Sequence, residues 1–480
     1  MHRGFQVALA LSSVVGLTVP LNAVPLRAIQ GDSATLPVTD GNSQHQAPQN
    51  QAPQNQANAE LPRDDWNGFR GPRRDGVARH ANPPIAWSND ENVAWRVDLP
   101  GPGASSPIVH GKLVIVICYT GYGSHLDDGG KLEDLALHVI AFDRTSGSKT
   151  WQYDLDAPLT KKPPQMQTTE HGFATPTPTC DDERIYAYLG HAGVLALDLD
   201  GKEVWHVDTG TPNPDAAPPT NQVVRDGKTL SLRWGAAGSP LLAGDLVIVN
   251  ASEESNSIRA YDRKTGKLAW KRESSNLEGC ATSPMLAGRG DASVVVVMLG
   301  GEVWGLDPRT GAVCWSVETE TRGGISPTPV ADDDIVYTFG GSGESLALRF
   351  AKKLEEGDDR TFWKSKNLAI PSPLLHEGKL YLVAMSGMGA CLDAKDGAIL
   401  FDERLDGRTS KIYSSPVFAG GRLYVVSRKR GTFVYSADGK FDLLARNELD
   451  DDSHFNASPA VDGDRLFLRS DRRLYCIAKS

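Results

Sequence analysis

The sequence predicts an all-β fold: an eight-bladed β-propeller of four-stranded antiparallel blades, with the ring closed by an N-terminal strand. Three observations predict it. A small hydroxyl residue followed by proline recurs eight times, a motif with aspartate, glycine and tryptophan recurs between these steps, and the two ends of the chain complement each other. Repeats of about 43 residues, built from short apolar runs and turn residues, are typical of propeller blades.

The hydroxyl-proline step marks the start of each predicted blade. It occurs at Ser106-Pro107, Thr175-Pro176, Ser239-Pro240, Ser283-Pro284, Ser326-Pro327, Ser372-Pro373, Ser415-Pro416 and Ser458-Pro459. Each step leads into a short apolar run, a turn rich in Gly or Asp, and a second apolar run, a pattern that predicts two antiparallel strands. The first two intervals between these prolines are 69 and 64 residues and the later ones 43 to 46. The extra residues indicate insertions near the start of the ring.

The second motif is Ala-x-Asp, a turn with glycine, and then tryptophan, as in Ala141, Asp143, Gly147 and Trp151. The aspartate can accept hydrogen bonds from the turn, glycine adopts a positive φ, and tryptophan supplies a flat surface between neighbouring sheets. The tryptophans expected to pack the blades together are Trp95, Trp151, Trp205, Trp270, Trp315 and Trp363.

The ends of the chain test the blade count. Only 21 residues follow Pro459, and they end just past the equivalent of the Ala-x-Asp strand, so the eighth blade lacks its outer strand. Trp95 stands twelve residues before Pro107, as Trp315 stands twelve residues before Pro327. We therefore expect the strand around Trp95 to complete the last blade, which removes the open sheet edges that invite aggregation.

Residues 1–28 have the features of a secretory signal peptide: a basic start, an apolar run from Phe5 to Val19, and small residues near Ala23 and Ala28. The run is shorter than the about 20 residues that a membrane-spanning helix needs. Residues 29–62 are rich in Gln, Asn, Ala and Pro, which predicts a disordered tether. One propeller domain is expected over residues 63–480. We expect an exported, periplasmic or extracellular protein, with no cysteine near the cleavage region for a lipid anchor.

The composition excludes several function classes. Sixty acidic and 50 basic residues give a net charge of −10, whereas a nucleic-acid-binding protein needs a concentrated basic surface. A hydrophobic content of 40% is ordinary for a globular chain and argues against an integral membrane protein. Six cysteines without a CxxC pair provide neither a disulfide framework nor metal-ligand spacing. We expect a monomer.

Three insertions, at 119–135, 155–172 and 209–233, are predicted to crowd one face of the ring. In a propeller, loops joining strands two and three and loops joining blades emerge on the same face, and long loops in compact folds are more often functional than not. Trp234 lies outside the tryptophan register and is either an exposed contact or packed under the third insertion. The candidate ligand-binding residues at this face are Glu170, His171, Arg233, Trp234, Glu278, Arg322, Lys411 and His454, with Glu253, Asn256 and Arg428 from loops between second and third strands.

The repeats with Ala-x-Asp, Gly and Trp resemble the tryptophan-docking motif of pyrroloquinoline quinone (PQQ) propellers over about residues 85–480. The segment 66–72, followed by Asp75-Gly76, resembles the lead-in of secreted PQQ-like repeat proteins from planctomycete-type bacteria. The resemblance implies one of two functions. Quinoprotein dehydrogenases bind PQQ and calcium and oxidise alcohols or sugars, whereas the B component of the outer-membrane β-barrel assembly machine binds proteins without a cofactor.

Catalytic signals are weak. Alcohol-oxidising dehydrogenases of the superfamily resemble one another in a vicinal Cys-Cys pair, and here no two cysteines are adjacent. A quinone site would need an acidic base, calcium ligands, cations and an aromatic platform, residue types that any acidic protein of this size supplies. We assign no catalytic residue and no metal ligand. We expect a non-catalytic binding or scaffold module of the cell envelope, without cofactor, whose partner is a protein or a glycan. A PQQ- and calcium-dependent dehydrogenase is the alternative.

Overall fold

The computed structural model describes residues 65–479, apart from 124–128, 164–166, 212–222, 226–227, 231–233, 322–324, 341–343, 367–370 and 406–410. Of β11 (Val223–Arg225) and β12 (Lys228–Leu230), which form a separate hairpin, it describes the backbone alone. The predicted signal peptide and tether lie outside the described residues. The propeller lies in the unit Pro62–Ser480.

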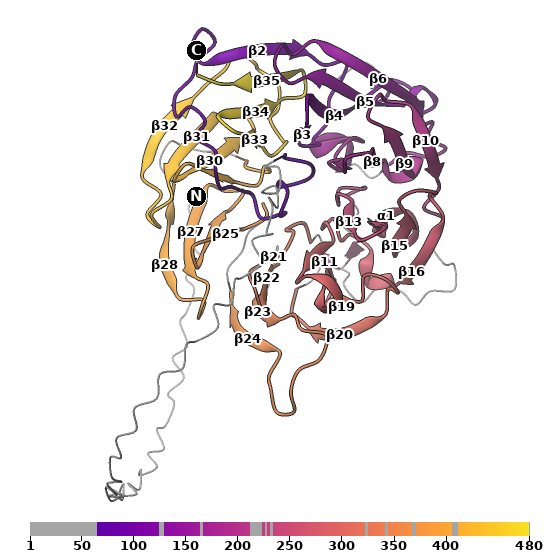
Figure 1. Ribbon diagram of the computed structural model, residues 1–480, viewed down its shortest axis with the longest axis vertical. Coiled ribbons are helices and arrows are strands. Elements are labelled where there is room, and N and C mark those ends of the chain that lie inside the picture. The colour runs from indigo at the N-terminus through magenta and orange to yellow at the C-terminus, as the bar shows by residue number, and fades with distance from the viewer. Residues whose placement is uncertain are drawn as a thin grey trace, which may run out of the picture. The chain divides into compact units, whose positions relative to one another are not determined.

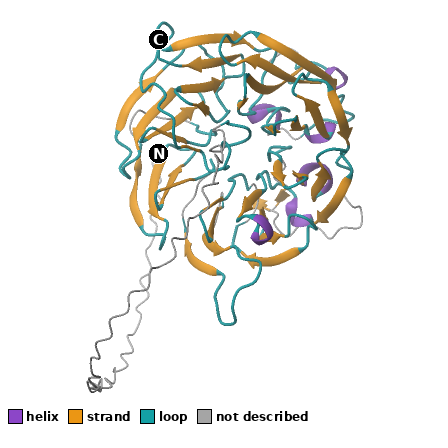
Figure 2. Cartoon of the chain, viewed as in Figure 1, coloured by secondary structure: helices purple, strands orange, loops and turns teal. Residues whose placement is uncertain are grey.

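Eight blades of four antiparallel strands stand around a common centre, and one blade gains a fifth strand (Figures 1 and 2), which confirms the predicted fold class. From the inner strand outward, the first four blades are β3 (Ile108–His110), β4 (Leu113–Thr120), β5 (Ala136–Asp143) and β6 (Lys149–Asp156); β7 (Thr179–Cys180), β8 (Arg184–Tyr188), β9 (Val194–Asp198) and β10 (Glu203–Val207); β13 (Leu241–Ala243), β14 (Leu246–Ala251), β15 (Ser257–Asp262) and β16 (Leu268–Glu273); and β17 (Met285–Ala287), β18 (Val294–Leu299), β19 (Glu302–Leu306) and β20 (Val313–Glu318).

The remaining blades continue the same order: β21 (Val330–Ala331), β22 (Ile335–Phe339), β23 (Ser345–Arg349) and β24 (Thr361–Ser365); β25 (Leu374–His376), β26 (Lys379–Val383), β27 (Met388–Asp393) and β28 (Ile399–Arg404); β29 (Val417–Ala419), β30 (Arg422–Ser427), β31 (Gly431–Ser436) and β32 (Leu443–Asn447); and β33 (Ala460–Asp462), β34 (Arg465–Arg469), β35 (Arg473–Ile477) and β2 (Val93–Asp98). The short helices are η1 (Leu132–Asp134), η2 (Gln167–His171), η3 (Gly190–Ala192), α1 (Ser252–Ser255), η4 (Ser275–Leu277) and η5 (Gly290–Ala292).

Ring closure occurs in the eighth blade, as the two ends of the chain predict. Strand β2 pairs antiparallel with β35, with Trp95 opposite Cys476. In Figure 1 the indigo β2 lies beside the yellow β35, so the N-terminal and C-terminal parts of the propeller share one sheet. The same cross-strand position holds Ala141 opposite Trp151 and Cys391 opposite Phe401. A small residue under the aromatic ring is therefore a repeated packing position, and Cys476 and Cys391 occupy it.

The six outer-strand tryptophans named from the sequence all contact a neighbouring sheet. Each indole N–H donates to a backbone carbonyl of the next blade over 2.9–3.1 Å, as Trp151 does to Leu199. A Cβ added to Gly201 would approach the Trp151 ring to 2.5 Å, and Gly201 has a φ of +82°. Glycine is needed at this turn because the tryptophan of the preceding blade lies directly on its backbone.

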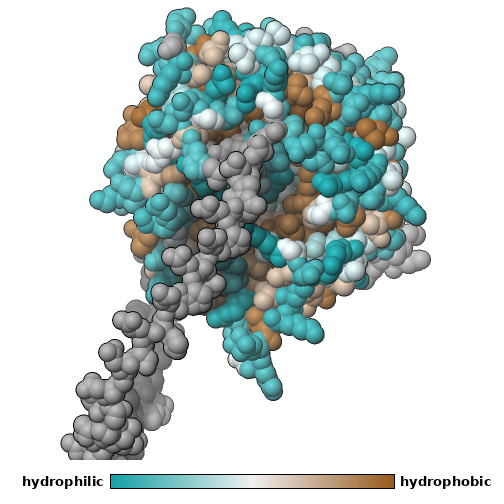
Figure 3. Space-filling model, in the orientation of Figure 1, coloured by the Kyte–Doolittle hydropathy of each residue, from teal (hydrophilic) through white to brown (hydrophobic). Residues whose placement is uncertain are grey.

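The second strand of each blade is apolar on both faces because a blade is sandwiched between two others. Strand β18 is an example, since all six of its residues are buried. Outer strands instead alternate, with the tryptophan facing inward and charged residues facing solvent. The face in Figure 3 is largely hydrophilic, and its apolar side chains form separate groups. Within the described ranges, no helix has the length and apolar character required to cross a bilayer.

The segment between Asp65 and Ala78, here called the lead-in, has a place in the fold that the sequence did not predict. Its strand β1 (Val77–Ala78) pairs parallel with β29 and makes a fifth, innermost strand in the seventh blade. Trp66 and Arg70 are each 1% exposed, so the lead-in is an integral part of the folded propeller. Arg70 donates to the carbonyl oxygens of Asp75 and Pro373, and the second bond ties the lead-in to the sixth blade.

Candidate functional site

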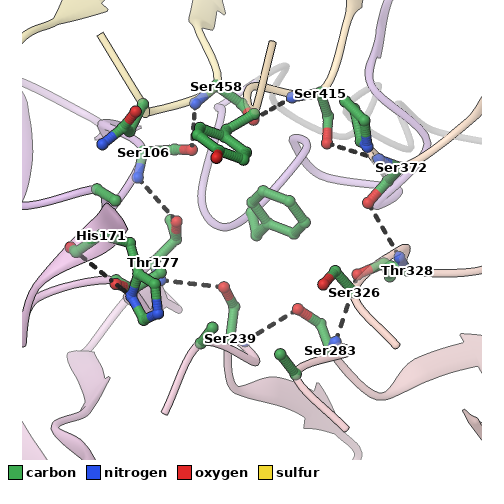
Figure 4. Close-up of a pocket in the computed structure, with 18 of the residues that line it drawn as sticks. Ser106, His171, Thr177, Ser239, Ser283, Ser326, Thr328, Ser372, Ser415 and Ser458 are labelled. Atoms are coloured by element: carbon green, nitrogen blue, oxygen red, sulfur yellow. Dashed lines mark hydrogen bonds between the residues drawn. The ribbon is translucent and has the colours of Figure 1, made fainter. Parts of the chain in front are cut away.

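A closed ring of eight hydrogen bonds lines the central channel (Figure 4). One Ser or Thr per blade uses its side-chain oxygen to accept the backbone N–H of the equivalent residue in the preceding blade, over 2.8–3.3 Å. The ring residues are Ser106, Thr177, Ser239, Ser283, Thr328, Ser372, Ser415 and Ser458. Because Ser458 donates back to Ser106, every blade is tied to both of its neighbours.

Two of the hydroxyl-proline steps predicted from the sequence are displaced by two residues. The second and fifth blades contain Thr-Pro-Thr-Pro and Ser-Pro-Thr-Pro, and the ring members are Thr177 and Thr328 rather than Thr175 and Ser326. Only the second hydroxyl of each pair is in register with its neighbours. The predicted eightfold repetition is right, and its assignment in these two blades is wrong.

A second layer of side chains lies two residues before the ring. Side chains of residues i and i+2 point to the same side of an extended chain, so both layers face the channel. The described members of this layer are Ala104, Thr175, Ala237, Ala281, Ser326, Tyr413 and Asn456, and all of them line the cavity. Five are small, and the two large ones come from the seventh and eighth blades. The channel is therefore wide on the side of the first five blades and constricted by Tyr413 and Asn456.

The two layers enclose a cavity of about 500 Å³. Besides the residues of these layers, its lining consists of Phe69, Glu170, His171, Trp234, Pro371, Met385 and Lys411. This volume falls within the about 300–1,000 Å³ typical of small-molecule sites. Four of the candidates named from the sequence thus meet in one cavity: Glu170, His171, Trp234 and Lys411.

Glu170 reaches from the second insertion to the seventh blade. Its carboxylate accepts hydrogen bonds from the Tyr413 hydroxyl at 2.8 Å and from Arg428 at 2.5 Å, and its other oxygen lies 3.9 Å from the Lys411 ammonium. Burial alone would raise the pKa of Glu170, but the hydrogen bonds from Tyr413 and Arg428 and the two positive charges lower it overall. Asn456 donates to the Glu170 backbone carbonyl at 2.9 Å. Helix η2 is therefore fastened across the cavity mouth to blades seven and eight.

His171 and Trp234 hold the other side of the mouth. The Nε2 atom of His171 lies 2.7 Å from the Trp234 carbonyl oxygen, and Nδ1 lies 2.6 Å from the Thr175 hydroxyl. A carbonyl only accepts, so Nε2 carries a proton. Burial lowers the pKa of His171 to about 4. The Trp234 Nε1 atom is buried without a hydrogen-bond partner, and its backbone N–H donates to Glu253 at 3.3 Å. Among the described residues, Trp234 is thus a cavity residue whose indole N–H has no acceptor.

The remaining candidates lie elsewhere or outside the described residues. His454 is next to the cavity, 3.5 Å from Arg428 and 3.3 Å from Asp471, without lining it. Glu278 and Asn256 are not among the lining residues; Asn256 ends α1 with a φ of +47°. Arg233 and Arg322 lie outside the described residues.

Sequence comparison identifies the family. The family model described as "Outer membrane protein assembly factor BamB" matches residues 77–161, 138–356 and 351–442. The chain belongs to this family of PQQ-like β-propellers. Its membership agrees with the predicted resemblance, while the assignment to a planctomycete-type branch stays a prediction. No curated protein matches the sequence.

Solved PQQ-like propellers of two functional classes share the fold. BamB from Moraxella catarrhalis is 17% identical with a TM-score of 0.56, covering 80% of this chain and 96% of that one. A europium-containing methanol dehydrogenase is 13% identical with a TM-score of 0.57, covering 86% and 98%. The quinohemoprotein alcohol dehydrogenase from Comamonas testosteroni is 14% identical with a TM-score of 0.54, covering 87% and 81%. At these identities the comparison establishes the PQQ-like fold alone.

The dehydrogenase branch of the PQQ-like fold implies PQQ and calcium, and the described lining supplies few carboxylate ligands for the calcium. Calcium takes six to eight oxygen ligands, mostly carboxylates and carbonyls. Among the described residues no three His, Cys, Asp or Glu side chains cluster as a metal site. The described cavity lining offers one carboxylate, Glu170, whose oxygens are already bound by Tyr413, Arg428 and Lys411.

Phe69, Tyr413 and Asn456 are among the cavity residues of this PQQ-like propeller that sequence reasoning missed. Tyr413 and Asn456 carried a usable signal, because they lie two residues before a hydroxyl-proline step and the period-2 rule places them on the same side as the step. Phe69 carried none. Its place in the channel depends on how the lead-in crosses four blades.

Proposed function

We propose that this protein is an exported, non-catalytic binding module of the cell envelope. Its central cavity, on the face that carries the second insertion, takes a small ligand or the end of a larger one. The supporting observation is the state of Glu170, which is the one carboxylate of the described lining and is neutralised by Arg428 and Lys411. A pocket with small walls, aromatic side chains and a few convergent polar groups suits recognition.

A glycan end is favoured over a protein segment as the occupant. The described walls combine aromatic rings, from Phe69, Trp234 and Tyr413, with hydroxyl and amide groups, from the serine and threonine ring and Asn456. Sugars present both an apolar ring face and many hydroxyl oxygens, which match such walls. A protein partner bound by the insertions outside the cavity would keep its affinity when residues inside the cavity are changed. Mutations in the cavity therefore distinguish a glycan ligand from such a protein partner.

The proposal is tested with a cavity-filling variant and a matched control. Ala281→Phe places a ring in the cavity, and Ala269→Phe makes the same change at an exposed position of β16. Titration calorimetry of the full chain against neutral and acidic mono- and oligosaccharides is expected to detect binding that Ala281→Phe abolishes and Ala269→Phe retains. Binding that survives Ala281→Phe, or no saccharide binding at all, would count against the cavity as the site.

The dehydrogenase alternative has its own assay. The full chain is incubated with PQQ and calcium, and dye reduction is followed over a panel of alcohols and sugars. We expect no turnover above a control lacking protein. Turnover that Ala281→Phe abolishes and Ala269→Phe retains would overturn the proposal of a non-catalytic module.

A further inference from the structure

The lead-in closes one end of the channel. Its backbone carbonyls accept hydrogen bonds from inner strands of the first, second and seventh blades, each at 2.9 Å: Trp66 from Val109, Asn67 from Cys180, and Gly76 from Phe418. All three donors come after the ring residue of their blade, whereas Trp234, Lys411 and Asn456 come before it. The lead-in therefore lies on one side of the serine and threonine ring and the charged mouth on the other.

Phe69 forms the closed end of the cavity. It is the one lead-in residue in the described lining, and its neighbours Gly68 and Arg70 are buried while Phe69 is partly exposed. Its free surface thus belongs to the cavity. A ligand entering from the mouth therefore meets an aromatic ring at the bottom, an arrangement that suits insertion of the end of a chain-like ligand.

The walls supply both hydrogen-bond donors and acceptors. Each ring hydroxyl oxygen accepts one backbone N–H, which leaves its proton and its second lone pair for other hydrogen bonds. The Trp234 Nε1–H is a buried donor without a partner among the described residues. A complementary ligand is rich in hydroxyl groups and has a ring face that packs on Phe69.

Lys411 is the one cation among the described residues that line the cavity. Glu170 faces two cations, Arg428 at 2.5 Å and Lys411 at 3.9 Å. The Arg428 side chain is 7% exposed and pairs with Glu170, whereas the Lys411 side chain is 59% exposed and lines the cavity. Lys411 is therefore the cation that an anionic group of a ligand can reach.

We propose that the cavity binds the terminal sugar of an acidic glycan, with the sugar ring against Phe69 and its carboxylate beside Lys411. This inference rests on the proposed binding function and adds the ligand class and the direction of entry. The hydroxyl-lined wall accounts for the sugar hydroxyls, the aromatic end accounts for recognition of a terminus, and the exposed Lys411 accounts for the acid.

Charge recognition is tested with trigalacturonate and its methyl ester, titrated into the full chain at low salt. We expect the acid to bind at least tenfold more tightly than the ester. Lys411→Gln is expected to remove that preference, and Lys395→Gln, the same change at an exposed turn between β27 and β28, is expected to retain it. Equal affinities for acid and ester in the parent protein would overturn the inference while leaving the proposed binding function intact.

End recognition and the role of Phe69 are tested separately. Long polygalacturonate is expected to bind in proportion to its number of chain ends, and binding in proportion to its number of residues would overturn end-on entry. Phe69→Leu is expected to weaken acid and ester alike, by roughly 2- to 10-fold from the lost ring contact, while Phe362→Leu on β24 changes neither. Tighter binding of a free aromatic acid such as 4-hydroxybenzoate than of trigalacturonate would overturn the glycan assignment. Failure of every saccharide would overturn the proposed function as well.

Discussion

Replacing Thr177 by valine removes one acceptor from the hydrogen-bonded ring at constant side-chain shape. Thr177 is 2% exposed, and its hydroxyl accepts the Ser106 backbone N–H at 2.9 Å. Valine leaves that buried N–H without a partner, which costs about 1–3 kcal/mol. Thr177→Ser keeps the acceptor, and six of the eight ring positions already hold serine.

The size of the propeller makes the thermal shift small. Unfolding entropy is about 2.1 cal/mol/K per residue, so a unit of this length loses roughly 1 °C of Tm for each kcal/mol. The expected drop for Thr177→Val is therefore about 1–3 °C. Hydrogen exchange is the sharper assay, because a peptide containing the Ser106 amide should exchange at least about fivefold faster in Thr177→Val than in Thr177→Ser. Equal exchange rates and equal Tm values in the two variants would refute the reasoning that the ring stabilises the blade contacts.

Three further predictions concern closure, pH and the mouth. Trp95→Ala should destabilise the propeller by about 3–5 kcal/mol in urea unfolding and Trp95→Phe by about 1 kcal/mol, since the second change keeps an aromatic ring and loses the N–H bond to Arg144. Similar values for both would contradict the reasoning that burial of the ring contributes more than that bond. The folded-state pKa of His171, about 4, lies below its unfolded value of 6.5, so the unfolded chain takes up the proton first as the pH falls. The free energy of unfolding should therefore decrease between about pH 6.5 and pH 4, by up to about 3 kcal/mol. A His171→Gln variant with the same loss over that window would exclude His171 as the cause. Glu170→Gln should lower the free energy of unfolding by about 2 kcal/mol because it leaves buried Arg428 without its anion. Glu183→Gln, at an exposed ion pair, should lower it by less than about 1 kcal/mol. Equal urea midpoints for the two variants would show that the contact between η2 and blade seven does not stabilise the propeller.

The candidate site could be predicted only in part. Glu170, His171, Trp234 and Lys411 were identified because they lie just before inner strands or in an insertion on the predicted face, and the topology brings that face together. Glu278 met the same criteria and does not line the cavity. The position of a residue in a loop determines the face of the ring on which it lies. The distance of its side chain from the channel axis depends on how that loop packs, which the sequence does not show. Export, the boundaries of the signal peptide and tether, and the monomeric state stay predictions.

The sequence by itself determined the number of blades, their strand order and the closing strand. These follow from local periodicity: the hydroxyl-proline steps, the glycine turns and the tryptophans repeat within each unit, and Trp95 is in register with the incomplete last blade. Only the tertiary structure decided which hydroxyl of Thr175 and Thr177 joins the ring, that Phe69 ends the cavity, and that Glu170 meets Arg428 across 258 residues of chain. The physical reason is that these contacts join different blades, and their geometry exists only once the ring has closed.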